Sequence, residues 1–451
     1  MDKLREKVST FVNGFIQGDW ITRLSYIIMG VGSLLRKQWV RGITYLGLQI
    51  MLLYYLVTYG FSQIAGLRYL GTQTQGQVFD ESRGIYVYTS GDNSMLFLLF
   101  GVVAIFIIIA FIGIYFISVF NAIENQKIIE QGKKLPSFKQ DLNALMNERF
   151  HITTLTIPTI LTFVFTILPL VFMILIAFTN FDANHQPPGN LFTWVGLDNF
   201  KKVLSGQGNI SHTFFQILQW TFIWAFFATF LNYVLGMLLA MLINSKAIKL
   251  KKMWRTIFIV TIAVPQFVSL LLMRNLLADQ GSLNFVMQNI GLIDSPIRFL
   301  SDPTIAKITV IVINCWVGIP YSMLITSGIL MNIPQDMYES ADIDGATPWI
   351  KFRKITLPYM LSVTAPYLIT QFVGNINNFN VIFLLSGGGP LTLEYHQAGK
   401  TDLLVTWLYK LTVNQKDYSL ASVIGIIIFV ITATLSLVVF RNVMKREREF
   451  G

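Results

Sequence analysis

Charged residues are scarce in this chain. Of its 451 residues, 13% are Asp, Glu, Lys or Arg, whereas 53% are hydrophobic. Soluble globular domains contain about 25% charged residues. The composition therefore argues against an ordinary soluble protein and predicts an integral membrane protein.

Cysteine and histidine are rarer still. The single cysteine, Cys315, can form neither an intrachain disulfide nor a thiolate metal cluster. The histidines have no paired ligand spacing and are more typical of surface or interface residues; they are His151, His185, His212 and His396. We therefore expect no metal site in this chain.

Long apolar runs, by contrast, occur throughout the sequence. A helix needs about 20 apolar residues to cross a bilayer, and none of the 24 Asp and Glu residues falls inside the runs, as the hydrocarbon core requires. The runs predict an all-α integral membrane protein with eight transmembrane helices. They lie at 43–61, 95–120, 157–178, 214–243, 257–277, 307–330, 366–385 and 419–440.

The basic residues indicate the orientation of these spans. Most of the 34 Lys and Arg lie in the two terminal segments and in the loops after spans two, four and six. Because Lys and Arg are enriched on the cytoplasmic side, both termini and the 331–358 loop are predicted to face the cytoplasm. The net charge of +10 then reflects topology and anionic membrane lipid, and not nucleic acid.

The chain changes character near Ile157. Before it, apolar residues recur at helical spacing from Trp20 to Leu35, which predicts an amphipathic helix on the inner leaflet or against the helix bundle. The 62–94 loop could form a small hairpin. The expected segments are an N-terminal segment at 1–42, a two-span extension at 43–156, a six-span core at 157–440 and a cytoplasmic tail at 441–451.

A polar segment, 331–358, separates two apolar runs. Its first part is acidic, Gly345 and Pro348 interrupt it, and its last part is basic before Pro358. Acids near a helix start and bases near a helix end suit the helix dipole. A glycine followed closely by a proline predicts two short helices that meet at a bend.

The spacing within this segment resembles the cytoplasmic EAA loop of ABC importer permeases. Glu339-Ser340-Ala341 is followed after three residues by Gly345, and after nine more by Ile355-Thr356-Leu357-Pro358. In that family the loop is a coupling helix pair seated in a separate ATPase subunit. The resemblance implies coupling roles for Glu339, Ser340, Ala341, Asp344, Gly345, Ile355, Leu357 and Pro358.

Predicted span six carries polar residues on one face. Asn314, Gly318 and Tyr321 fall at i, i+4 and i+7. Such groups are costly against lipid, so they should line a cavity or a helix contact. Amides and a tyrosine suit a neutral solute rich in hydroxyl groups, and hydrogen bonding between helices is the alternative.

Predicted span seven repeats this spacing. Gln371, Asn375 and Asn378 again fall at i, i+4 and i+7. Aromatic residues nearby, Trp316, Phe372 and Phe379, suit the apolar faces of pyranose rings. The same two interpretations, a sugar-lined cavity and an interhelical contact, stay open here.

Further motifs resemble the larger permease of maltose/maltodextrin importers. They are the Asn314–Tyr321 run, Asn375–Phe379, Ser386–Pro390 and Thr401–Val405. The resemblance implies the type I ABC importer permease fold, with two N-terminal helices added to a six-helix core. It also implies a mid-membrane sugar site formed by Asn314, Val317, Gly318, Tyr321, Gln371, Gly374, Asn375 and Asn378.

The same resemblance implies partners and a function. The expected partners are a second permease subunit in a heterodimer, two copies of a cytoplasmic ATPase subunit, an extracellular sugar-binding protein, an oligosaccharide and membrane lipid. The expected function is maltose or maltodextrin import across a bacterial plasma membrane. Permeases for other neutral oligosaccharides, of raffinose or galactooligosaccharide type, are the alternative. This transport function leads us to expect no cofactor and no catalytic residue in the chain.

Two other protein classes are weighed against this one. An ion-coupled secondary transporter normally places a carboxylate or a broken helix at the membrane midplane, and no predicted span contains a carboxylate. A membrane enzyme needs an acid, a base or a metal near the surface, and no His or Cys accompanies the acids of 336–344. Gly399-Lys400-Thr401 mimics a P-loop end, but Glu394 stands where that pattern needs glycine.

Overall fold

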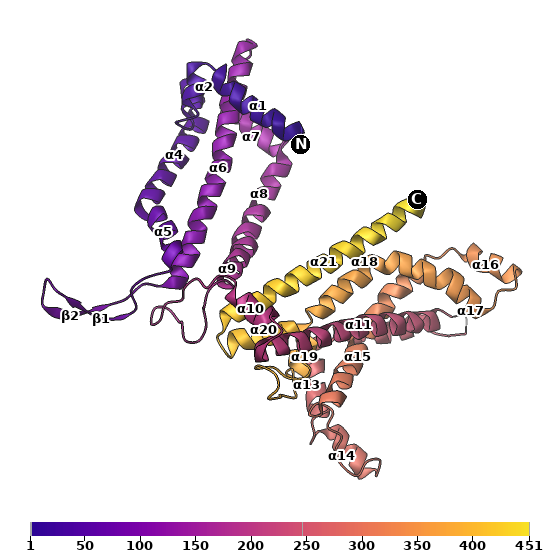
Figure 1. Cartoon of the computed structure of the whole chain (residues 1–451). Helices are drawn as coiled ribbons and strands as arrows, with labels where there is room; N and C mark the ends of the chain where they lie inside the picture. Colours follow the sequence, from indigo (N-terminus) through magenta and orange to yellow (C-terminus); the bar gives the residue numbers. More distant parts are fainter. Residues whose placement is uncertain (1, 246, 451) are drawn as a thin grey trace. The chain divides into compact units, whose positions relative to one another are not determined.

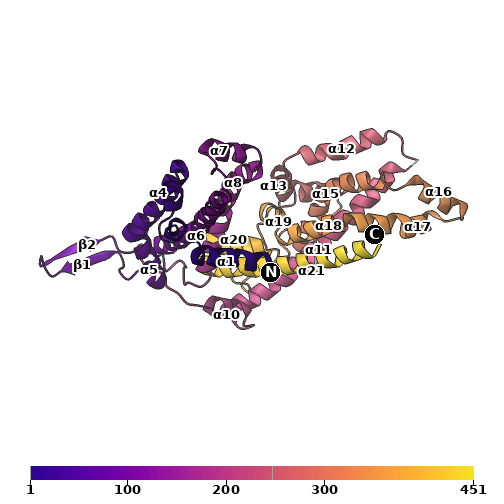
Figure 2. The ribbon, with the colours of Figure 1, turned by 90° about the horizontal axis from the view of Figure 1, so that it is seen from above.

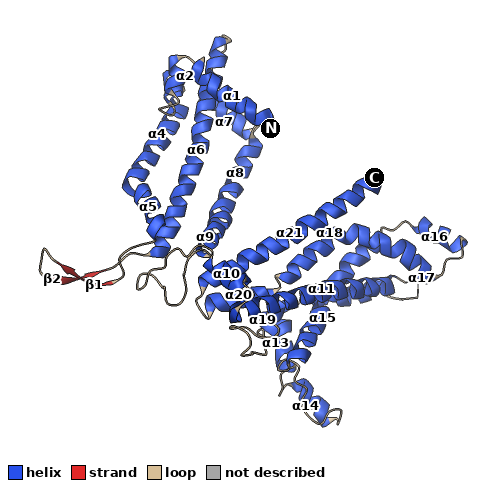
Figure 3. Cartoon of the chain, in the orientation of Figure 1, coloured by secondary structure: helices blue, strands red, loops and turns tan. Residues whose placement is uncertain are grey.

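The computed structural model describes residues 2–245 and 247–450. Within that range the protein is helical except for one two-stranded hairpin (Figure 3), so the predicted all-α fold class is confirmed. The chain forms two compact units that divide between Val195 and Gly196. The expected start of a six-span core near Ile157 stays a prediction. The helical stretch that contains Ile157, Phe150–Ile176, belongs to the first compact unit.

The first unit contains three helical stretches long and apolar enough to cross a membrane: Trp39–Tyr69, Ser94–Glu130 and Phe150–Ile176. They correspond to the first three predicted spans. The elements of this unit are α1 (Asp2–Ile16), α2 (Trp20–Leu24), α3 (Val31–Leu35), α4 (Trp39–Tyr55), the π-helical turn η1 (Leu56–Gly60), α5 (Phe61–Tyr69), β1 (Gly76–Asp80), β2 (Ile85–Thr89), α6 (Ser94–Glu130), α7 (Phe138–Met146), α8 (Phe150–Thr162), η2 (Phe163–Ile167) and α9 (Leu168–Ile176).

The single amphipathic helix expected from Trp20 to Leu35 is wrong. The segment forms two short helices, α2 and α3, because Gly30 adopts a positive φ of 80° between them. Asp19 caps α2 by accepting the Thr22 backbone N–H at 2.8 Å, and it also pairs with Arg36 at 2.9 Å. Asp19 and Arg36, which do not belong to the apolar pattern, thus hold the two ends of the segment together.

The hairpin expected in the 62–94 loop is confirmed. β1 and β2 pair antiparallel with Val78 opposite Val87 and Phe79 opposite Tyr86. Asp92 holds the base of the hairpin by accepting the backbone N–H groups of Thr72 and Gln73 at 2.7 and 3.0 Å. These two hydrogen bonds lower the pKa of the Asp92 carboxyl.

The second unit contains the loop resembling the EAA loop and both polar spans (Figure 1). Its elements are α10 (Asp198–Leu204), α11 (Gly208–Asn244), α12 (Lys251–Ala263), α13 (Gln266–Leu276), α14 (Ser282–Asn289), α15 (Pro303–Leu330), α16 (Gln335–Ile343), α17 (Pro348–Lys351), the π-helical turn η3 (Phe352–Thr356), α18 (Leu357–Ile376), α19 (Phe379–Leu385), α20 (Leu404–Val413) and α21 (Tyr418–Phe450).

Two of the predicted spans in this unit are bent. The run expected at 257–277 is divided into α12 and α13, which meet at 86°, and the run expected at 366–385 is divided at 41° between α18 and α19. Pro265 ends the first helix because it has no backbone N–H to donate, and Asn378 caps α19. The described residues give six unbroken spans, or eight if each bent pair counts as one.

The centre of the second unit is the contact between α11 and α15, which lie side by side (Figure 1, Figure 2). Small residues allow the two backbones to approach closely, as is common between membrane helices. A Cβ at Gly236 would meet Ser322, and Ala240 packs against Met323. This contact fixes the position of the polar face of α15.

The loop between α19 and α20 is held by a buried ion pair. Lys410 donates to Asp402 at 2.6 Å, and Asp402 also accepts from the Gly399 backbone N–H at 2.7 Å and from the Thr406 hydroxyl at 2.8 Å. The Trp220 indole of α11 donates to the Thr401 carbonyl at 3.2 Å. These contacts attach the loop to α11 at the end of the unit opposite α16 and α17 (Figure 1).

Candidate functional site

The segment between α15 and α18 forms the two helices and the bend that its sequence predicts. α16 ends at Ile343, Gly345 follows with a positive φ of 73°, and α17 begins at Pro348. Glycine adopts this φ most readily, because it has no Cβ. The Ala346 backbone N–H donates to the Ala341 carbonyl at 2.9 Å and closes the turn.

Side chains hold the bend in one geometry. The Tyr338 and Thr356 hydroxyls share a hydrogen bond of 2.8 Å, which joins α16 to η3. Lys351 of α17 pairs with Asp342 of α16. Thr347 caps α17 through the Ile350 backbone N–H. The two helices therefore form a small preformed module.

This module exposes large apolar side chains although its sequence is polar. Ile343 is 87% exposed and Trp349 is 66% exposed, and Met337 is also exposed. An apolar group of this kind on a polar segment marks a surface for a partner protein. Of the residues implied in coupling, Ala341, Ile355 and Leu357 are partly buried, and the exposed ones are Glu339, Ser340, Asp344, Gly345 and Pro358.

The polar residues of α18 contact α11. The Asn375 side-chain amide donates to the Thr229 hydroxyl at 3.0 Å, and the Asn375 backbone carbonyl accepts from the Trp224 indole at 3.0 Å. Asn378 lies beyond the end of α18, where its side chain caps α19 and donates to Asn375 at 3.3 Å. The expected single helix face of Gln371, Asn375 and Asn378 is therefore wrong, because the helix stops at Ile376.

The polar residues of α15 also face α11. A Cβ at Gly318 would collide with the Asn232 amide, so the glycine makes room for that side chain. Asn314 is only 5% exposed. Its amide nitrogen and the Asn232 amide oxygen are buried and have no hydrogen-bond partner among the described residues. A buried polar group without a hydrogen-bond partner costs about 1–3 kcal/mol. A bound hydroxyl group or a water molecule would supply the missing hydrogen bonds.

The remaining residues of the implied sugar site lie toward open surface. Tyr321 is 47% exposed, Gly374 is exposed, and Val317 and Gln371 are partly buried. The structure thus divides the implied set: Gly318 and Asn375 lie against α11 and Asn314 is buried, whereas Tyr321 and Gly374 are exposed.

Three polar contacts on α11 were missed by sequence reasoning. They are Trp224, Thr229 and Asn232, and each touches a residue of α15 or α18 that was singled out. The signal for Asn232 was present, since it is an amide in the middle of the apolar run 214–243. Over the described part of the chain, no three His, Cys, Asp or Glu side chains gather as a metal site requires.

Comparison with known proteins gives consistent relatives. The family described as "Binding-protein-dependent transport system inner membrane component" matches residues 232–449. The galactooligosaccharide transport system permease protein GanP of Bacillus subtilis (strain 168) is 34% identical over 431 residues, which cover 95% of this chain and 99% of GanP. The maltodextrin transport system permease protein MalC of Streptococcus pneumoniae (TIGR4) is also 34% identical, over 94% of this chain and 95% of MalC.

A solved structure shares the fold. The crystal structure of a bacterial ABC transporter for import of the acidic polysaccharide alginate matches with a TM-score of 0.56 and 22% identity, over 67% of this chain and 98% of that chain. The resemblance drawn from the sequence motifs is confirmed by the family match and by the two permeases. This chain belongs to the sugar permeases of binding-protein-dependent ABC importers, as a noncatalytic multi-pass subunit of the inner membrane.

Proposed function

We propose that this permease imports neutral oligosaccharides, with maltodextrins as its first substrates. The observation that supports a neutral sugar most directly is the set of uncharged amides around the α11–α15–α18 contact, two of which have unpaired polar atoms. Galactooligosaccharides are the second candidate, because GanP and MalC are equally similar to this chain. Both substrate classes present hydroxyl groups and pyranose faces to the same kinds of side chain.

Within the complex, this chain would pair with a second permease and with two copies of a cytoplasmic ATPase. The apolar side chains of α16 and α17 would be covered by one ATPase subunit, with Glu339, Ala341 and Gly345 at the contact. The exposed side of Tyr321 and Gly374 would face the second permease across the sugar pathway. An extracellular sugar-binding protein would deliver the substrate at the opposite end, near the loop held by Asp402.

The proposed mechanism is alternating access. ATP-driven closure of the ATPase pair would move the α16–α17 module, and the helices joined to it would shift between an outward-facing and an inward-facing arrangement. The sugar would exchange its contacts with water for contacts with Asn314, Val317, Gly318, Tyr321, Gln371, Gly374, Asn375 and Asn378.

The substrate assignment is tested by uptake. The complete transporter is reconstituted in proteoliposomes with its binding protein, and ATP-dependent uptake of labelled maltodextrins and galactooligosaccharides is measured separately. We expect uptake of maltodextrins above that of galactooligosaccharides. The reverse order would transfer the assignment to the second candidate, and uptake of neither would exclude both.

The orientation is tested by thiol labelling. Because Cys315 is the single cysteine, a Cys315→Ser background permits one new thiol at a time. In cells that produce the permease without the ATPase, a cysteine at Ile343 should react with a membrane-impermeant reagent only after the cells are opened. A cysteine at Ser82, in the hairpin turn, is the matched outer control and should react in intact cells. Labelling of the Ile343→Cys variant in intact cells would refute the cytoplasmic placement.

A further inference from the structure

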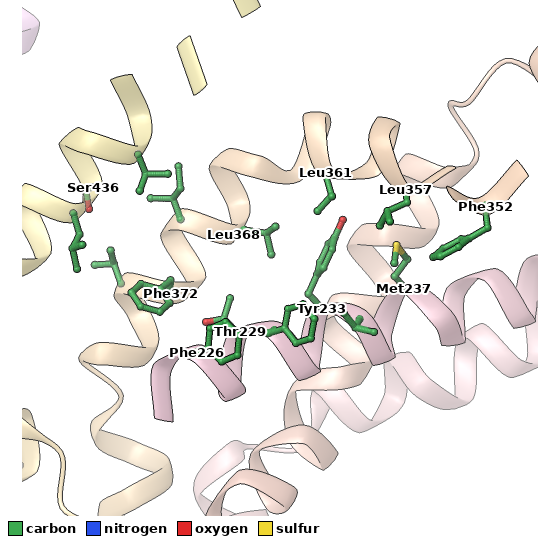
Figure 4. A pocket seen from close by; sticks show the side chains of 16 residues that line it. Phe226, Thr229, Tyr233, Met237, Phe352, Leu357, Leu361, Leu368, Phe372 and Ser436 are labelled. Atoms are coloured by element: carbon green, nitrogen blue, oxygen red, sulfur yellow. The ribbon is translucent and has the colours of Figure 1, made fainter. Parts of the chain in front are cut away.

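A cavity of about 570 Å³ lies among α11, α18 and α21 of the second unit (Figure 4). It is separate from the unpaired amides described above, because neither Asn232 nor Asn314 lines it. Its walls are almost wholly apolar and include Phe226, Phe230, Met237, Leu357, Leu368 and Phe372. Phe226 and Phe230 stack with their ring centroids 5.6 Å apart and form one wall.

The few polar side chains of the cavity are largely occupied. The Thr229 hydroxyl accepts the Asn375 amide, and the Tyr233 hydroxyl shares a hydrogen bond of 2.8 Å with Thr364. Ser436 is the third polar residue in the lining. A sugar has many hydroxyl groups to satisfy, so this lining suits a hydrocarbon ligand and does not suit a sugar.

The length and chemistry of the cavity suit an extended acyl chain. Its lining on α18 runs from Leu357 to Val373, which is about 24 Å at the helical rise. An extended acyl chain is long and narrow, and its hydrocarbon has no polar group that the apolar walls would leave unsatisfied.

One end of the cavity carries positive charge. Phe352 and Leu357 line that end, and the exposed Arg353 and Lys354 lie between them in the sequence. The sequences of α11, η3, α18 and α21 as far as Arg441 contain no Asp or Glu. The adjoining α16 does carry acids, of which Asp342 is paired with Lys351. An anionic headgroup would meet the two exposed bases Arg353 and Lys354.

We propose that this cavity binds an anionic phospholipid of the cytoplasmic leaflet, with one acyl chain between α11, α18 and α21 and the headgroup at Arg353 and Lys354. The leaflet rests on the proposed orientation, whereas the acyl-chain site does not. The lipid would touch Phe352 and Leu357 directly, which places it against the helix that continues from the α16–α17 module. Its occupancy would then brace the position of that module.

The first test measures bound lipid in the purified complete transporter by native mass spectrometry, with phosphatidylglycerol and phosphatidylcholine supplied in equal amounts. We expect phosphatidylglycerol to be retained. Arg353→Gln and Lys354→Gln should each weaken its retention about fivefold, since one base near an anionic lipid contributes about that factor. Equal retention of both lipids, or no effect of either variant, would overturn the headgroup assignment.

The second test fills the cavity. Leu368→Trp should remove the retained lipid, whereas Val312→Trp, on the exposed surface of α15 and outside the cavity lining, is the matched control and should not. A photoreactive residue at Leu361 should crosslink to lipid. Crosslinking to the companion permease instead would assign the cavity to that subunit and refute the proposal. Neither readout requires sugar transport, so failure here leaves the substrate assignment untouched.

Discussion

Substitution of Gly345 tests whether the bend between α16 and α17 acts as the coupling joint. The backbone φ of 73° at this residue lies in the left-handed region, and a Cβ added there would meet no atom within 4 Å. Strain and contact can therefore be separated. Alanine would suffer the strain alone, asparagine would tolerate the φ while carrying a larger side chain, and arginine would add bulk and charge.

The size of the strain follows from the backbone. A left-handed conformation costs a non-glycine residue about 1–2 kcal/mol, which corresponds to roughly a 5- to 30-fold shift in the population of the bent form. Gly345→Ala should therefore lower ATP-coupled uptake within that range. ATP-coupled uptake by the Gly345→Asn variant should be impaired less than uptake by the Gly345→Ala variant if only backbone strain matters. It should be impaired more if an ATPase surface approaches Gly345 closely.

The assay compares uptake and sugar-stimulated ATP hydrolysis in proteoliposomes that contain equal amounts of each variant. Gly345→Arg should abolish both activities while the protein still inserts and assembles with its companion permease. Wild-type uptake by this arginine variant would refute the coupling role of the loop. Loss of insertion would be detected by the amount of permease in the membrane and would call for the asparagine variant to decide.

Three further predictions concern packing in the second unit. Asp402→Asn should lower the free energy of unfolding of the purified permease by about 3–5 kcal/mol, because Lys410 would keep a buried charge without its partner. Lys400→Gln breaks the more exposed pair with Glu394 and should cost less than about 1 kcal/mol. Equal losses of unfolding free energy in the two variants, measured with denaturant, would contradict the argument. Gly318→Val should lower the unfolding temperature, because the valine would force the Asn232 side chain out of its place. Gly374→Val should not, because no atom lies within 4 Å of a Cβ at that position. A larger loss for Gly374→Val than for Gly318→Val would contradict the described packing of α15 on α11. Trp224→Phe should cost about 1 kcal/mol through loss of the hydrogen bond to Asn375, and an unchanged denaturation midpoint would show that this bond has no net effect.

Local chemistry explains which parts of the fold were predictable from the sequence. The α16–α17 bend follows from Gly345 and Pro348, and the hairpin follows from the strand-forming Tyr86 and Tyr88. Each depends on neighbours within about ten residues. The apolar runs were also located correctly, because a 20-residue hydropathy signal is stronger than the preference of any single residue.

The bends within spans and the contacts between distant helices were not predictable in the same way. Hydropathy cannot tell a straight span from a bent one, so the breaks near Pro265 and Asn377 were missed although the proline was visible. The partners of Asn375 and Gly318 lie about 80 to 150 positions earlier on α11, and no periodicity within α15 or α18 identifies them. Sequence reasoning found the polar residues and missed the helix on which they pack.

The continuity of one helical run connects the two halves of the candidate site. α17, η3 and α18 follow without interruption from Pro348 to Ile376, so the bend at Gly345 and the hydrogen bonds of Asn375 lie at the two ends of one rod. Most turns of this run are held by their own backbone hydrogen bonds, and the π-helical turn η3 and Pro366 are the positions inside it where a helix bends most readily. Displacement of the α16–α17 module would therefore move Asn375 against Trp224 and Thr229, and the break at Asn377 and Asn378 would allow α19 to remain in place. The bend at Gly345 and the break at Asn377 and Asn378 thus mark the two ends of the helical run that would carry the motion.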